Sequence, residues 1–174
     1  MIHVCSLARL HQTVADTGAR HVVTLLKDTD LVARPESILS DNHLILGMDD
    51  IDETLDGYVV PADDHVTKLL TFVRAWDRAN PLVVHCYAGI SRSTAGAFVA
   101  ACALNPHRNE LAIARELRRQ SVTASPNPLA GFLGCWGPGR FIFSPGGSFQ
   151  SWQTRAWPGC WQRRSISRFR TSGC

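Results

Sequence analysis

A cysteine and an arginine lie six residues apart in the segment VVHCYAGISRST, which spans residues 83–94. A loop wrapped around an anion at a helix N-terminus offers the positive potential and the N–H donors that a phosphate monoester needs. Gly89 permits a positive φ in such a loop. The planar guanidinium of Arg92 can hold two phosphate oxygens, a geometry that lysine does not reproduce. The spacing therefore predicts a phosphate-binding loop.

Cys86 is the predicted nucleophile of this loop. The helix dipole, the loop amides and Arg92 all favour its thiolate over its thiol, and a thiolate inside the loop is placed to attack phosphorus. We expect Ser93 to donate a hydrogen bond to the departing sulfur and His85 to orient the loop from behind. The alternative is a buried packing thiol beside a surface arginine. The pattern H-C-x-x-G-x-x-R between an apolar strand and a helix favours the functional interpretation.

The elements around this loop alternate between strand-like and helix-like segments. Strands are predicted from β-branched and apolar runs at residues 2–5, 21–26, 43–48 and 81–85. Helices are predicted from apolar spacing at residues 7–17, 63–78, 93–104 and 109–120, with Ser6 as a possible N-cap and Gly18 as a C-cap. This alternation predicts an α/β fold, a three-layer α/β/α arrangement around a four-stranded parallel sheet. Ligands bind such sheets beyond the carboxyl ends of the strands, where Cys86 lies.

The segment from His85 to Ser93 resembles the signature of cysteine-dependent protein tyrosine phosphatases, in the form found in dual-specificity enzymes and their compact bacterial relatives. The resemblance covers about residues 1–128 and implies a cysteinyl-phosphate intermediate, with no metal and no cofactor. It implies Cys86 as nucleophile, Arg92 as phosphate ligand and Ser93 as the residue that assists thiolate departure. The substrate-binding loop it implies consists of Tyr87, Ala88, Gly89, Ile90, Ser91 and Arg92.

The leaving oxygen needs a proton and the second step needs a base, and one carboxylic acid can serve both. The family places an aspartate on a loop upstream of the signature. Here Asp49, Asp50 and Asp52 follow the third predicted strand, and Asp50 precedes Cys86 by 36 residues. We prefer Asp50 because Ile51 can anchor its loop, while Asp49 and Asp52 stay open. The Trp-Pro-Asp loop of the larger receptor-type phosphatases is missing.

Composition bounds the remaining possibilities. The 174 residues suit one domain with a sizeable core. No apolar run is long enough for a membrane span, no signal-peptide pattern opens the chain, and the six cysteines form no C-x-x-C pair. We therefore expect a cytoplasmic protein with free thiols. The partner expected is a phosphorylated protein or peptide, because residues 87–91 lack the lysine or arginine frequent in phosphoinositide phosphatases. We expect no membrane partner, and no nucleic acid, since residues 1–128 carry a net charge of −3.

The character of the chain changes after Pro128. Residues 1–128 carry 12 Lys and Arg against 15 Asp and Glu, whereas residues 129–174 carry six arginines and no acid. Four of the five tryptophans and eight of the thirteen glycines lie in this second part. We therefore expect a catalytic domain at 1–128 and an irregular tail at 129–174. Our hypothesis is that the reading frame shifts near residue 128, which would replace the final helix of the family.

Two alternatives to an active phosphatase remain. One is a phosphate-binding pseudophosphatase that has Cys86 and Arg92 but no working acid. The other is an inactive product whose tail fails to support the domain, since a lost final helix would expose apolar sheet surface.

Overall fold

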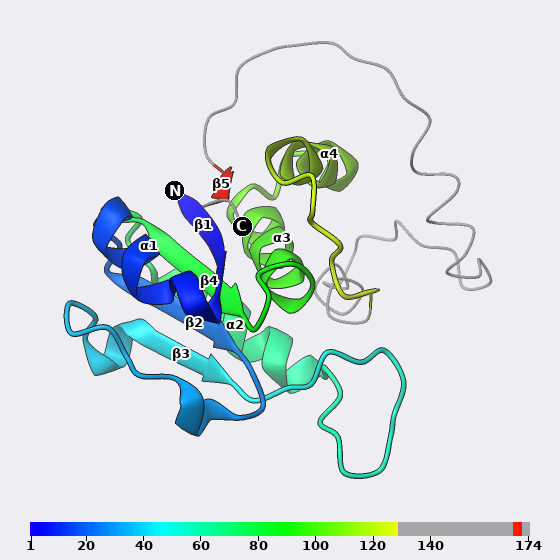
Figure 1. The fold of residues 1–174 in the computed structure, drawn as a ribbon. Coiled ribbons are helices and arrows are strands. Elements are labelled where there is room, and N and C mark those ends of the chain that lie inside the picture. Colours follow the sequence, from blue (N-terminus) through cyan, green and yellow to red (C-terminus); the bar gives the residue numbers. More distant parts are fainter. Residues whose placement is uncertain (129–168, 172–174) are drawn as a thin grey trace.

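A computed structural model of the chain describes residues 1–128 and 169–171. Its sheet has the strand order β3-β2-β4-β1-β5, and all paired strands run parallel (Figure 1). The strands are β1 (Ile2–Ser6), β2 (His21–Leu25), β3 (His43–Leu46), β4 (Leu82–Cys86) and β5 (Phe169–Thr171). The first four are the predicted parallel sheet. The fifth lies in the segment predicted to be irregular, and it adds a short edge strand to β1.

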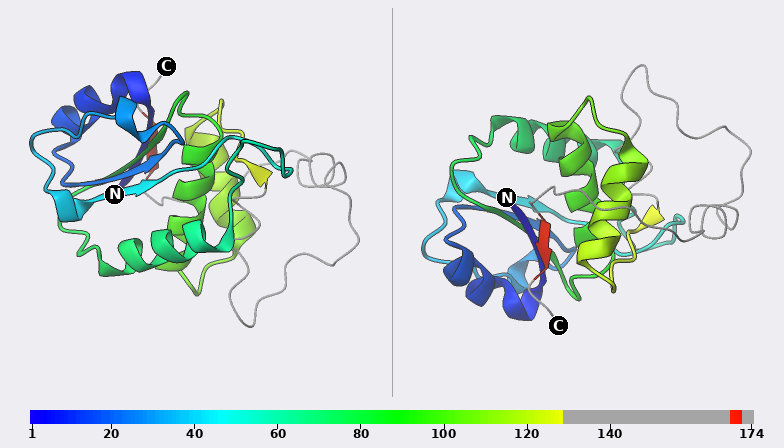
Figure 2. Two further views of the ribbon diagram at one scale, coloured as in Figure 1. Left: turned by 90° about the horizontal axis from the view of Figure 1, so that it is seen from below. Right: turned by 90° about the horizontal axis from the view of Figure 1, so that it is seen from above.

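The helices cover both faces of the sheet, which confirms the three-layer α/β/α prediction. They are η1 (Leu7–Arg9), α1 (Leu10–Thr17), η2 (Thr29–Leu31), η3 (Ser40–Asn42), α2 (Asp63–Ala75), α3 (Arg92–Leu104) and α4 (Glu110–Gln120). Figure 2 shows α1 on one face and α2 and α3 on the other, with α4 beyond α3. Among the described residues, none of these helices has the length and apolar character that crossing a bilayer requires.

The central strand β4 belongs to both halves of the core. Leu82 and Val84 pack toward α2 and α3, together with Leu69 and Val73. Val83 points to the opposite face, where residues of α1 pack against it. All three β4 residues are completely buried, and burying such a side chain contributes roughly 1.5–3 kcal/mol. A strand that is apolar on both faces is typical of the centre of a parallel sheet.

Two predicted helix boundaries differ from the observed ones. Ser6 makes no side-chain capping bond, and the chain first forms the 3₁₀ turn η1 before α1 begins at Leu10. Helix α2 ends at Ala75 rather than at residue 78, because Trp76 adopts an extended backbone and its Nε1–H donates to the Asn80 carbonyl at 3.0 Å. The apolar spacing could not show that Trp76 reaches the core from outside the helix.

Candidate active site

The Cys86 side chain lies at the carboxyl end of β4, where the phosphate-binding loop begins. It is only 2% exposed. The Gly89 N–H donates to its Sγ at 3.3 Å, and the Ser93 Oγ lies 3.1 Å from the same sulfur. Ser93 is itself buried in the first turn of α3. The sulfur therefore has two polar neighbours that can stabilise a negative charge, as the sequence predicted for this position.

Gly89 is required by the backbone of the loop and by its surroundings. Its φ is +77°, in the left-handed region. A Cβ atom at this position would lie 2.7 Å from the backbone carbon of Cys5 and 2.7 Å from the backbone nitrogen of Ser6. The loop thus packs directly against the end of β1, at a distance that no residue with a side chain permits.

The carbonyl groups of the loop are bonded to the surrounding protein. The Tyr87 carbonyl accepts from the Leu7 N–H at 3.1 Å, and the Ile90 carbonyl accepts from the Ser125 N–H at 3.0 Å. The Ser91 carbonyl accepts from the Ala95 N–H at 3.0 Å. With their oxygens held by other segments, these peptide units leave the opposite, N–H side of the loop for an anion.

Arg92 opens α3 and reaches the loop that follows β3. Its side chain is 11% exposed, and its Nη1 donates to the Met48 carbonyl at 2.8 Å. Its Nε is buried and has no hydrogen-bond partner among the residues that the structure describes. The Oδ2 atom of Asp50 lies 3.8 Å from that Nε, beyond hydrogen-bond length. A buried guanidinium donor without a partner indicates a place for an anionic ligand.

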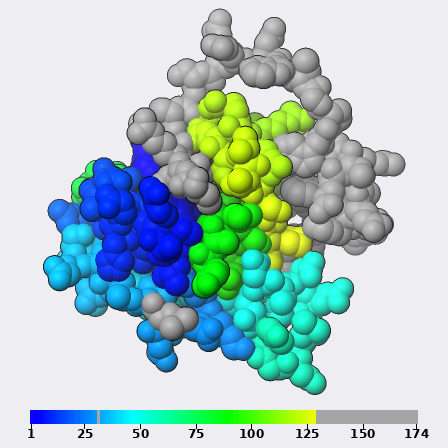
Figure 3. Space-filling model, in the orientation of Figure 1, coloured from blue at the N-terminus to red at the C-terminus, as the bar shows by residue number. Residues whose placement is uncertain are grey.

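Asp50 extends over the phosphate-binding loop. Its Oδ1 accepts from the Ser91 Oγ at 2.7 Å and from the Asn127 Nδ2 at 3.0 Å. Figure 3 shows the three segments meeting on one surface: the loop after β3 in cyan, the phosphate-binding loop in green and the chain before Pro128 in yellow. The carboxylate is 38% exposed, so it lies at the boundary between the site and solvent.

The other two acid candidates lie in different surroundings. The Asp49 Oδ2 accepts from the Val59 N–H at 2.7 Å and forms an ion pair with Lys27 at 3.4 Å. Asp52 is exposed. Asp49 therefore holds the two ends of its own loop together, whereas Asp50 contacts the phosphate-binding loop. The geometry favours Asp50 among the three aspartates that the sequence left open.

His85 lies behind the loop in a buried polar chain. Its Nε2 is 2.7 Å from the Thr24 Oγ1, which is 2.8 Å from the His43 Nε2. Burial lowers the pKa of His85 to about 4, with His43 acting in the same direction and a hydrogen bond to the Cys86 backbone opposing it. Burial also lowers the pKa of His43. Both rings are therefore neutral near pH 7, and the Thr24 hydroxyl can donate to one and accept from the other.

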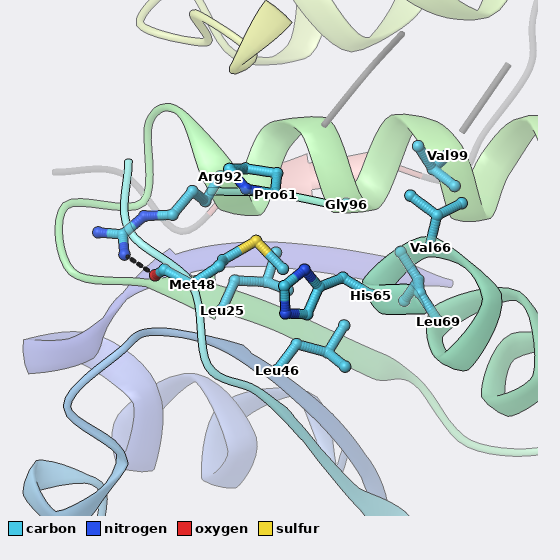
Figure 4. Close-up of a pocket in the computed structure, with 10 residues that line it drawn as sticks. All are labelled: Leu25, Leu46, Met48, Pro61, His65, Val66, Leu69, Arg92, Gly96 and Val99. Carbon is cyan, nitrogen blue, oxygen red and sulfur yellow. Dashed lines mark hydrogen bonds between the residues drawn. The ribbon is translucent and has the colours of Figure 1, made fainter. Parts of the chain in front are cut away.

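A small apolar pocket lies behind Arg92 (Figure 4). It is just large enough for one water molecule. Its lining residues are Leu25, Leu46, Met48, Pro61, His65, Val66, Leu69, Arg92, Gly96 and Val99. The figure shows the Arg92 guanidinium turned away from this pocket toward the Met48 carbonyl. The stem of Arg92 therefore forms part of the pocket wall, while its charged end lies outside the pocket.

A second cysteine lies close to the site but differs in character. Burial raises the pKa of the Cys5 thiol to about 11, so Cys5 stays protonated at physiological pH. Within residues 1–128 and 169–171, no cluster of three or more His, Cys, Asp or Glu side chains is arranged to hold a metal ion.

The structure brings together every predicted site residue, from His85 to Ser93 and Asp50. The sequence analysis did not identify two residues of the site: Asn127, which contacts Asp50, and Thr24, which links the two histidines. Asn127 lies 77 residues after Asp50, so no local pattern connects them. The sequence offered only one signal, an asparagine between two prolines, Pro126 and Pro128.

Known proteins resemble this chain in part of its sequence and in its fold. A family model described as protein-tyrosine phosphatase matches residues 56–124. No curated protein matches the chain. Among solved structures, the Cydia pomonella PTP-2 phosphatase is similar with a TM-score of 0.59 at 18% identity, covering 75% of this chain and 81% of its own.

Two further solved structures share the fold. Human DUSP28 has a TM-score of 0.58 at 16% identity, covering 76% of this chain and 87% of its own. PTPMT1 in complex with PI(5)P has a TM-score of 0.55 at 16% identity, covering 77% and 87%. These solved structures show that the chain has the fold of protein tyrosine phosphatases and dual-specificity phosphatases, and the family model matches part of it. The bacterial branch of the resemblance stays a prediction.

Proposed function

We propose that the chain is a protein phosphatase that hydrolyses phosphotyrosine, and secondarily phosphoserine or phosphothreonine, through a cysteinyl-phosphate intermediate. The carrying observation is the Cys86 sulfur, which lies between the Gly89 N–H and the Ser93 hydroxyl. The unpartnered Nε of Arg92 adds a buried cationic donor to the same loop. A nucleophile, an anion ligand and a carboxylic acid are thus present together.

The reaction has two displacement steps. In the first, the Cys86 thiolate attacks phosphorus, the S–P bond forms and the ester P–O bond breaks. The bonding electrons go to the leaving oxygen, which Asp50 protonates. In the second, a water oxygen attacks phosphorus and gives a proton to Asp50. The new P–O bond forms as the S–P bond breaks, its electrons return to Cys86 as thiolate, and inorganic phosphate leaves. Ser93 stabilises the departing thiolate by a hydrogen bond.

Two observations favour a phosphoprotein substrate, with phosphotyrosine preferred. Cys86 is only 2% exposed, so a long aryl phosphate reaches its sulfur more readily than a short alkyl phosphate does. PTPMT1 was solved with the phosphoinositide PI(5)P, but residues 87–91 of this chain hold no lysine or arginine to bind a polyanionic headgroup.

The test is phosphate release from an aryl phosphate by the wild type, Cys86→Ser and Asp50→Asn. Cys86→Ser should lose nearly all activity, and Asp50→Asn should lower kcat about 10²–10³-fold and abolish the basic limb of the pH profile. Asp49→Asn is the matched control, because Asp49 bonds Val59 and Lys27 instead. It should retain the basic limb.

Three outcomes are decisive against parts of the proposal. A folded wild type that binds orthovanadate but releases no phosphate is a pseudophosphatase. Activity that survives Cys86→Ser excludes the covalent mechanism. Equal kcat/KM for phosphotyrosine peptides, phosphoserine peptides and short-chain phosphoinositides removes the substrate preference.

A further inference from the structure

Asn127 lies outside the signature loop, yet it contacts both halves of the site. Its side chain is 3% exposed. Its Nδ2 donates to the Asp50 Oδ1 at 3.0 Å and to the Ile51 carbonyl at 3.2 Å. Its backbone N–H donates to the Ser91 carbonyl at 3.4 Å. One buried residue therefore joins the loop after β3 to the phosphate-binding loop.

The segment that carries Asn127 is itself fixed to the phosphate-binding loop. The Ser125 N–H donates to the Ile90 carbonyl at 3.0 Å, two residues before the Asn127 contact with Ser91. Residues 125–127 thus lie alongside residues 90–91 and are held to them by two backbone hydrogen bonds. Any contact that Asn127 makes with Asp50 therefore places that carboxyl group relative to the loop that holds phosphate.

The contacts distinguish the two oxygens of Asp50. Oδ1 accepts from both Asn127 and Ser91, which occupies its two lone-pair directions. Oδ2 lies on the side of Arg92, 3.8 Å from its Nε. Because Oδ1 already accepts two hydrogen bonds, a proton on this carboxyl group resides on Oδ2, the oxygen nearer to the phosphate ligand Arg92.

We infer that Asn127 is a positioning residue for the general acid: it fixes the rotation of the Asp50 carboxyl group so that Oδ2 delivers the proton. The inference rests on the proposed function. Ser91 provides the second constraint from the phosphate-binding loop, but it belongs to the substrate-binding segment already described. Asn127 supplies the constraint from outside that segment.

The test is a double-mutant cycle on kcat with two substrates. p-Nitrophenyl phosphate has a good leaving group that needs little protonation, whereas phenyl phosphate has a poor one. Asn127→Ala should lower kcat about tenfold for phenyl phosphate and less than about threefold for p-nitrophenyl phosphate, with KM nearly unchanged. On the Asp50→Asn background, Asn127→Ala should change kcat less than about twofold, because the group that it positions is gone.

Two further variants guard against simple loss of folding. Asn127→Leu nearly keeps the size of the side chain and removes the donor without adding a charge beside Asp50, so it should reproduce the effect on phenyl phosphate even where Asn127→Ala does not fold. Asn105→Ala removes an asparagine whose Nδ2 bonds the Ala101 carbonyl at the far end of α3, and it should leave both rates unchanged.

The outcomes separate this inference from the proposed function. Equal losses for both substrates, or losses that multiply on the Asp50→Asn background, mean that Asn127 is merely structural and overturn the inference while the phosphatase stands. A wild type without Cys86-dependent activity overturns the proposed function and the inference with it.

Discussion

At the scale of single residues, Gly89 combines a left-handed backbone with contact to the backbone of β1. Gly89→Ala should lower the free energy of unfolding by about 2–4 kcal/mol, since backbone strain and overpacking add, and should abolish phosphate release. Gly18 is the matched control, with φ +66° and open space within 4 Å of the point that a Cβ atom would occupy. Gly18→Ala should cost only about 1 kcal/mol. If urea unfolding showed that Gly89→Ala and Gly18→Ala lower the free energy of unfolding equally, the close contact between Gly89 and β1 would be contradicted.

The buried His85 ring predicts a pH dependence of stability. The folded protein keeps this ring neutral until its pKa of about 4, whereas the unfolded chain protonates it near the ordinary value of 6.5. The unfolded state therefore binds more protons between these values, so stability is full above pH 6.5 and falls as the pH drops toward 4. The loss from His85 amounts to about 3 kcal/mol.

The measurement is urea unfolding of the wild type and His85→Gln at several pH values across this window. Glutamine keeps a polar group near the Thr24 hydroxyl but does not titrate, so its stability should depend less steeply on pH. Parallel curves for the two proteins would show that His85 does not carry this dependence.

At the scale of elements, α4 begins with a side-chain cap. The Asn109 Oδ1 accepts from the Ala112 N–H at 3.2 Å. Asn109→Ala should lower the free energy of unfolding by about 1 kcal/mol, and Asn109→Ser should recover most of that loss, because serine also caps helices. Identical melting temperatures for the alanine and serine variants would count against the cap.

The elements also show which parts of the site the sequence could predict. The positions from His85 to Arg92 are contiguous, so an apolar strand, a glycine and a helix start suffice to place Cys86. The contact between Asp50 and the phosphate-binding loop depends on how two loops that are distant in the sequence pack together. From the sequence alone, the candidates for the general acid were therefore three aspartates, with Asp50 preferred. Asn127 was missed because its partner lies 77 residues away.

At the scale of the whole molecule, the chain divides by charge at Pro128, from −3 for residues 1–128 to +6 for residues 129–174. The predicted frame shift and most of the predicted tail lie outside the described residues, and only β5 represents them. Both the domain boundary at residue 128 and the frame shift stay predictions. A nucleotide sequence with no alternative frame encoding an amphipathic helix would exclude the frame shift.

The tail leads to a prediction about the stability of the whole chain. Replacing residues 129–174 with an amphipathic helix that covers the sheet should raise the melting temperature and reduce aggregation, because it buries apolar surface at about 25 cal/mol per Å². Thermal melting and light scattering of the two chains at equal concentration are the measurements. Equal melting temperatures and equal scattering would show that residues 129–174 stabilise the domain as much as the replacement helix does.

The position of β4 also has a consequence for hydrogen exchange. Val83 and Val84 pair with β1 on one side and with β2 on the other, so we expect their amide protons to exchange only through global unfolding. Loop amides near Asp50 lack such ladders on both sides, and we expect them to exchange orders of magnitude faster. The proposed nucleophile therefore follows a strand that we expect to open last, whereas the proposed proton donor lies on a loop that we expect to open early.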